Sequence, residues 1–152
     1  MQPLQAMITK SEYLDIYDVV GVAIEVYNNL GYGMAEAVYQ EAFALEMKLQ
    51  NMDFEREKQL RLYYKEIPIE KTDYADFYYN KIVIELKAVD AIISDHRAQL
   101  FNYMRIAKQD KGVLINFGEK SLRAERYIFD EEKNRFVLLS KDNYKHYILP
   151  FT

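Results

Sequence analysis

The sequence predicts an α/β or α+β fold in which a mixed central β-sheet is flanked by helices. Three segments carry apolar residues at helical spacing, and between and after them lie short runs rich in aromatic and β-branched residues, which are typical of strands. The chain has the length of one ordinary domain with a sizeable core. We therefore expect a single domain over residues 1–152, with a core from about 11 to 129 and a C-terminal strand and tail over 130–152.

The composition excludes several kinds of site. The 152 residues include no cysteine, so disulfides, thiolate metal sites and cysteine nucleophiles are absent. No apolar run reaches the ~18 residues of a membrane span, and the N-terminus lacks a signal-peptide pattern. We therefore expect a cytoplasmic protein without membrane contact. The net charge of −4 counts only mildly against nucleic-acid binding, since a metal ion can supply the positive charge that a carboxylate site lacks.

The two predicted N-terminal helices span residues 11–30 and 34–50, and Ser11 is the expected N-cap of the first. The first has an apolar stripe at helical spacing. In the second, one stripe is apolar and a neighbouring one begins with Glu36. A glutamate in a first helical turn complements the helix dipole. The stripes contain, in turn, Tyr13, Ile16, Tyr17, Val20, Ile24 and Tyr27; Val38, Ala42, Leu45 and Leu49; and Glu36, Tyr39, Phe43 and Met47.

The remaining elements follow in order. Residues 54–64 alternate and are highly charged, which predicts an exposed edge strand, and Pro68 suggests an irregular or edge position after it. A helix over 94–109, with Ser94 as N-cap, carries Gln99 and Tyr103 four residues apart on one face. The nearly continuous apolar run 111–117 predicts a buried strand, and 121–129 with 135–140 predict a final strand pair.

The segment from residue 74 to 89 reads as a β-hairpin with strands 74–79 and 82–88 around Asn80-Lys81. A two-residue loop sets Asp76 opposite Glu85. Strand alternation then gives one uncharged face and one face that also bears Lys87. The uncharged face contains Ala75, Phe77, Tyr79, Ile82, Ile84, Leu86 and Ala88.

Two opposed carboxylates are unfavourable by themselves. Their Cβ atoms would lie roughly 5 Å apart, and the repulsion would cost up to about 1 kcal/mol. A divalent cation between Asp76 and Glu85 would reverse that sign, and Mg²⁺ is commonly held by one or two carboxylates and waters. The alternative is a solvated sheet face, and a register slip of one residue would move Asp76 to the other face.

The chain also resembles a known family. Gly33-x-x-Glu36-x-x-Tyr39 resembles the signature of the GxxExxY proteins, which belong to the PD-(D/E)XK nuclease superfamily. Three further stretches fall in that family's order, and the resemblance covers about residues 13–129. They are Ile84-Glu85-Leu86-Lys87-Ala88-Val89, Ala98-Gln99-Leu100-Phe101-Asn102-Tyr103 and Leu114-Ile115-Asn116-Phe117-Gly118.

This resemblance implies a restriction-endonuclease-like core and a role for each matching residue. Asp76 matches the motif's aspartate and Glu85 its acidic metal ligand, and the Leu86 carbonyl would join them around Mg²⁺ or Mn²⁺. Lys87 matches the motif's lysine. Glu36 matches the acidic residue of the first core helix. Two departures are Ala75, where the motif has proline, and Tyr27, where many relatives carry histidine, so no role is assigned to Tyr27. The last match is Gln99 with Tyr103, the Gln-x-x-x-Tyr pair of the exonuclease-like branch.

The implied activity is metal-dependent hydrolysis of phosphodiester bonds in DNA, with RNA as the alternative substrate. The ion would polarise the phosphodiester and lower the pKa of the attacking water. Lys87, which two carboxylates keep charged, would stabilise the transition state. Glu36 would complete the metal shell or bind a second ion, while Gln99 would orient the site and Tyr103 would contact the substrate.

Two other interpretations stay open. A nuclease-like fold can serve as a non-catalytic module that binds nucleic acid or protein, because a fold does not determine a function. Alternatively, the charges of the hairpin form a structural ion-pair network, in which case removing Asp76 or Glu85 would lower stability. The surplus of 14 Tyr and 8 Phe fits a homodimer interface as well as a core.

Overall fold

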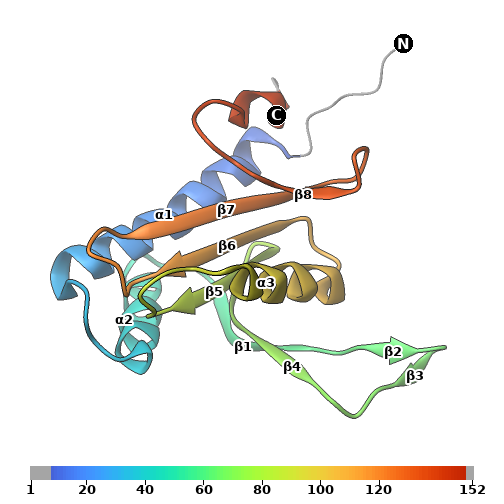
Figure 1. Ribbon diagram of the computed structural model, residues 1–152, viewed down its shortest axis with the longest axis horizontal. Coiled ribbons are helices and arrows are strands. Elements are labelled where there is room, and N and C mark those ends of the chain that lie inside the picture. Colours follow the sequence, from blue (N-terminus) through green and yellow to red (C-terminus); the bar gives the residue numbers. More distant parts are fainter. Residues whose placement is uncertain (1–7, 150–152) are drawn as a thin grey trace.

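A computed structural model describes residues 8–149, which form a mixed six-stranded sheet with helices on both faces (Figure 1). The predicted mixed sheet flanked by helices is confirmed. The outer limits 1 and 152 of the predicted domain lie outside the described residues. Among the described residues, no helix is long and apolar enough to cross a membrane. In order, the helices are α1 (Lys10–Leu30), α2 (Glu36–Leu49) and α3 (Ser94–Ala107), with a short 3₁₀ helix η1 (Tyr144–His146).

The sheet has the strand order β1-β4-β5-β6-β7-β8. Within the described sheet, the central pair, β5 with β6, is parallel and the other four neighbouring pairs are antiparallel. Helix α3 makes the crossover between β5 and β6. The predicted edge position of the charged strand β1 is confirmed. The strands are β1 (Phe54–Leu60), β2 (Tyr63–Tyr64), β3 (Ile67–Pro68), β4 (Asp73–Tyr79), β5 (Ile82–Lys87), β6 (Lys111–Asn116), β7 (Arg123–Asp130) and β8 (Arg135–Leu138).

Strands β2 and β3 form a separate two-stranded ribbon, which we call the arm (residues 61–69). It projects from the body of the molecule beyond β1 and β4 (Figure 1). The prediction of one strand over 54–64 is therefore wrong, because the chain leaves the main sheet after Leu60. Lys65 and Glu66, at the tip, have positive φ angles of 48° and 67°, as a tight two-residue hairpin loop requires.

The N-caps of helices α1 and α3 differ from those predicted. Thr9, not Ser11, is the N-cap of α1: its side chain accepts the backbone N–H of Glu12, whose carboxylate accepts the N–H of Thr9. This reciprocal pair is a capping box, which satisfies two N–H groups at once. Helix α3 begins at Ser94 itself, and His96 Nδ1 accepts the backbone N–H of Ile93. Ser94 is therefore not the cap.

Helices α1 and α2 cover one face of the sheet and α3 covers the other. In α2 the buried face is the predicted stripe that begins with Glu36, whereas in α1 the buried face differs from the predicted stripe. In α2, Tyr39 stacks on Phe117 with ring centroids 4.5 Å apart, and Phe43 packs on Phe77 at 5.0 Å. The other predicted stripe of α2 is exposed at Val38, Leu45 and Leu49. In α1 the buried residues are Ile16, Val19, Val22, Ala23 and Val26.

Candidate active site

The β4–β5 hairpin has the predicted register and the predicted two-residue loop, with Phe77 opposite Ile84. The backbone pairing of β4 with β5 ends at this pair, and beyond it hydrogen bonds from side chains connect the two strands. The backbone N–H of Asp76 donates to Glu85 Oε2 over 2.8 Å, and the N–H of Leu86 donates to Asp76 Oδ2 over 2.8 Å. The two carboxylates therefore lie together, each tied to the backbone of the other strand.

The other neighbour of Asp76 is an irregular position in β1. The β1–β4 register continues on both sides, but Glu57 and Asp76 form no ladder pair. Glu57 has a φ angle of 53°, a left-handed conformation that is rare for a non-glycine residue in a strand. The β1–β4 pair is irregular at this point, so the alternation of side chains between the two faces of β4 breaks. As a result, Ala75 packs on the α3 side while Phe77 packs on the opposite side, and the face predicted for Ala75 is wrong.

Helix α3 brings Gln99 to the end of β5. Lys87 Nζ donates a hydrogen bond to Gln99 Oε1 over 3.0 Å. Tyr103 follows one turn later, half-buried. Burial raises the pKa of the Tyr103 hydroxyl, and the negative charge of Glu85 raises it further, while hydrogen bonding with Gln99 lowers it. The structure thus brings both predicted α3 residues to the hairpin.

Helix α2 contributes Glu36 from its first turn. Burial raises the pKa of Glu36, followed by repulsion from Asp76, so the two carboxylates interact electrostatically. Sequence reasoning missed Gln40, whose side chain hydrogen-bonds Glu36 and Asp76 and lowers the pKa of both. The signal was the i, i+4 spacing from Glu36, which places Gln40 on the same helix face.

The carboxylates of the hairpin are partly desolvated. Glu85 is only 4% exposed, and burial followed by repulsion from Asp76 raises its pKa to about 8. Burial also raises the pKa of Asp76, and Glu57 adds to the effect. The positive charge of Lys87 lowers the pKa of Glu36, Asp76 and Glu85. Within residues 8–149, neither Asp76 nor Glu85 forms an ion pair within 4.0 Å, which disfavours the structural ion-pair interpretation.

The donor set fits a hard divalent cation. Two adjacent carboxylates whose charged forms are destabilised gain from a positive ion, and Mg²⁺ takes oxygen ligands and retains waters. Across the described part of the chain, no group of three or more His, Cys, Asp or Glu side chains is arranged to hold a metal ion. A cation at this point would therefore rely on Asp76, Glu85, backbone oxygen and water.

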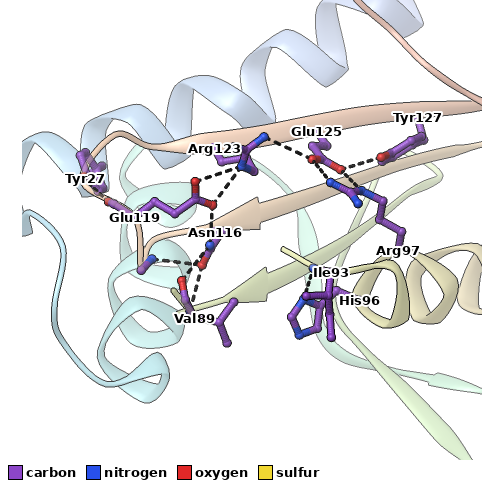
Figure 2. A network of polar contacts seen from close by, with 11 residues as sticks. Tyr27, Val89, Ile93, His96, Arg97, Asn116, Glu119, Arg123, Glu125 and Tyr127 are labelled. Carbon is purple, nitrogen blue, oxygen red and sulfur yellow. Dashed lines mark hydrogen bonds and ion pairs between the residues drawn. The ribbon is translucent and has the colours of Figure 1, made fainter. Parts of the chain in front are cut away.

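A side-chain clamp holds the end of β5 in place (Figure 2). Asn116, at the end of β6, accepts the backbone N–H of Val89 at Oδ1 over 3.0 Å and donates from Nδ2 to the Val89 carbonyl over 2.9 Å. Its Oδ1 also accepts the N–H of Gly118. Because Val89 lies two residues after Lys87, the clamp fixes the chain that leaves the site.

A second polar network lies beside this clamp (Figure 2). Arg97, on α3, makes two 2.8 Å hydrogen bonds to the carboxylate of Glu125, on β7. The hydroxyl of Tyr127 donates to the same carboxylate. Tyr27 donates to the carbonyl of Glu119 over 2.6 Å. These contacts join α1 and α3 to the β6–β7 region, and the sequence carried no pairing signal for them.

Comparison with known proteins identifies the family. A model of the PD-(D/E)XK nuclease superfamily matches residues 14–127, which is more than half of the chain. The chain belongs to this superfamily. The mixed sheet with helices on both faces agrees with the restriction-endonuclease-like fold expected of a PD-(D/E)XK protein.

Other comparisons add little to this result. No curated protein matches the chain. A solved structure described as the crystal structure of SSO0001 shares 14% sequence identity, covers 83% of this chain and 68% of its own, and has a TM-score of 0.44. Structural similarity at that level carries no argument about activity.

Proposed function

We propose that this PD-(D/E)XK protein is a metal-dependent nuclease of the GxxExxY type that hydrolyses phosphodiester bonds of DNA. The observation that carries the proposal is the position of Asp76, Glu85 and Lys87 where the β4–β5 ladder ends. The carboxylates are desolvated and repel each other. Lys87 lies two residues after Glu85 in β5, so both side chains lie on the same face of that strand. These are the three residues that the sequence motif predicts for the site.

Each residue has a proposed role. Asp76, Glu85 and the Leu86 carbonyl hold Mg²⁺ or Mn²⁺, which supplies a Lewis acid and an activated water when bound. Lys87 stabilises the negative charge that develops on the phosphoryl group. Its hydrogen bond to Gln99 holds the ammonium in position. Two supporting residues complete the site: Glu36 adds negative charge beside Asp76, and Tyr103 contacts the substrate.

Finer parts of the proposal have separate support. The whole chain acts as one nuclease domain, since residues on both sides of position 129 belong to one buried cluster.

A homodimer is supported by the exposed apolar stripe of α2, in which Val38 is 41%, Leu45 58% and Leu49 75% exposed. Such a stripe is typical of a helix that packs on a partner.

The test measures metal binding and cleavage on the same preparations. Calorimetry with Mg²⁺ and Mn²⁺ compares wild type with Asp76→Ala, and single- and double-stranded DNA and RNA serve as substrates. We expect binding and cleavage in wild type and loss of both in Asp76→Ala. Asp142→Ala, at an exposed aspartate of the C-terminal region, should behave as wild type. Absence of metal binding in wild type would contradict the proposal.

One observation favours a second function, a non-catalytic nucleic-acid-binding module. With a pKa of about 8, Glu85 is mostly protonated at neutral pH in the metal-free protein, and a protonated carboxyl is a poor metal ligand. This alternative predicts nucleic-acid binding that survives Asp76→Ala and no cleavage with either metal.

A further inference from the structure

The arm carries an unusual concentration of exposed aromatic and aliphatic side chains. Every residue from 61 to 68 is exposed, and Tyr63, Tyr64 and Ile67 are 58%, 63% and 66% exposed. A two-stranded hairpin by itself is marginally stable, so these side chains do not serve a core. Contiguous exposed apolar surface of this kind marks a binding site.

A cavity joins the base of the arm to the candidate active site. It has a volume of about 670 Å³, and its lining includes Leu62 from the arm and Gln99 and Tyr103 from α3. Gln99 is the hydrogen-bond partner of Lys87. The cavity therefore places the base of the arm next to the residue that positions Lys87.

The register of the arm determines which tyrosine shares a face with Leu62, the arm residue that lines the cavity. The carbonyl of Leu62 accepts the backbone N–H of Ile69, and Tyr64 pairs with Ile67. Side chains two residues apart in a strand lie on the same face, and neighbours lie on opposite faces. Tyr64 therefore shares the face of Leu62, which lines the cavity, whereas Tyr63 lies on the other face.

The charges of this region suit bases better than phosphates. The cavity is lined by Asp73 and Asp95 against a single cation, Arg105, so it does not attract the phosphate backbone. Aromatic rings bind bases by stacking, which tolerates any sequence and needs an unpaired base. Lys65 Nζ lies over one face of the Tyr64 ring, 5.5 Å from its centre, which leaves the other face for a stacked base.

We infer that the substrate contains a single-stranded segment of nucleic acid, whose unpaired bases stack on Tyr64 while the scissile phosphate lies at Asp76, Glu85 and Lys87. The placement of the phosphate rests on the proposed nuclease function. The contact with the arm does not, because it needs neither metal nor catalysis.

The test measures binding in EDTA, so that cleavage plays no part. Fluorescence anisotropy compares a labelled oligothymidylate of about 16 nucleotides with a duplex of the same length. We expect wild type to bind the single strand more tightly than the duplex. Tyr64→Ala should weaken single-strand binding by about 5- to 100-fold, since loss of one stacking ring has an effect of that size. The loss should persist from about 50 mM to about 200 mM salt, because stacking releases no counterions.

Tyr63→Ala is the matched control, an equally exposed tyrosine on the opposite face, and it should bind like wild type. Tyr64→Phe keeps the ring and should retain affinity. Three results would overturn the inference: equal affinity for duplex and single strand, equal losses in Tyr64→Ala and Tyr63→Ala, or no binding of the single strand. A parallel Mg²⁺ cleavage assay separates the two proposals. Cleavage without the Tyr64 effect leaves the nuclease and removes the arm's role, whereas the Tyr64 effect without cleavage does the reverse.

Discussion

Glu85 combines three features that rarely coincide in one side chain. It is buried at 4% exposure, it accepts the backbone N–H of Asp76, and it lies beside a second carboxylate. Burial and that neighbour raise its pKa to about 8. A carboxyl group with such a pKa destabilises the folded protein at high pH unless a cation is bound. This makes stability measurements a direct probe of the site.

The first prediction concerns pH. The folded pKa of Glu85, about 8, lies above its ordinary value of 4.5, so between these values the folded protein keeps a proton that the unfolded chain has lost. Its contribution to stability therefore falls as pH rises from 4.5 to about 8, by at most about 1.4 kcal/mol per unit. Glu85→Gln cannot ionise and keeps an oxygen acceptor. We expect it to exceed wild type in urea unfolding at about pH 8.5 in EDTA.

The controls for this prediction are a surface variant and added metal. Glu70→Gln, at an exposed glutamate that follows the arm, should retain the pH dependence of wild type. Mg²⁺ should stabilise wild type and have no effect on Glu85→Gln, because a ligand that binds only the folded state raises stability. If Glu85→Gln is less stable than wild type at about pH 8.5, the carboxylate has a structural role instead.

Among the elements, β5 and the chain after it depend on a close backbone approach. Gly118 follows β6, and a Cβ added there would overlap backbone atoms of Ala88 and Val89. Backbone cannot move aside as a flexible side chain can, and the same region holds the Asn116 clamp on Val89. The position of Lys87 thus depends on a residue thirty-one positions away in sequence.

We expect Gly118→Ala to lower the free energy of unfolding by about 1–3 kcal/mol and to reduce any cleavage activity further than the loss of folded protein explains. The matched control is Gly21→Ala. Gly21 lies inside α1 with nothing within 4 Å of an added Cβ, so that change should stabilise by about 0.5–1 kcal/mol. Urea unfolding of both variants tests the pair, and a stable Gly118→Ala protein would refute the close-approach argument.

At the scale of the whole molecule, the C-terminal region completes the core. Ile8 donates its backbone N–H to the Tyr147 carbonyl over 3.1 Å, and its own carbonyl accepts the N–H of Leu149 over 2.9 Å. Leu139 and Tyr147 belong to the same buried cluster as α1 and α2. Residues 130–149 therefore pack into the same folded unit as the helices.

This predicts that alanine substitutions at two adjacent leucines will lower the free energy of unfolding by very different amounts. Leu139 is 2% exposed and Leu138 is 46% exposed. Leu139→Ala should lower the free energy of unfolding by about 2–5 kcal/mol, because it removes buried methyl groups and leaves a cavity. Leu138→Ala should change it by about 0.5 kcal/mol or less. Thermal unfolding of the two variants provides the measurement, and similar melting temperatures would contradict the role given to the C-terminal region.

Sequence alone determined the order of the elements, the β4–β5 register and the resemblance to the superfamily. Local patterns suffice for these, since the two-residue loop sets the register and alternation sets the faces next to it. The same reasoning named Asp76, Glu85 and Lys87 as one group, and the structure places Asp76 and Glu85 together by hydrogen bonds across the two strands.

Features that depend on contacts between distant segments did not follow from the sequence and emerged in the fold. The bend at Glu57, which moves Ala75 to the other face, arises where β1 meets β4. The buried faces of α1 and α2 depend on which side chains meet the sheet. Gln40 joins the site because the fold places it in one pocket with Asp76. Periodicity reports that a helix has an apolar side, but the partner surface chooses among neighbouring stripes, because packing energy comes from contacts that lie far apart in sequence.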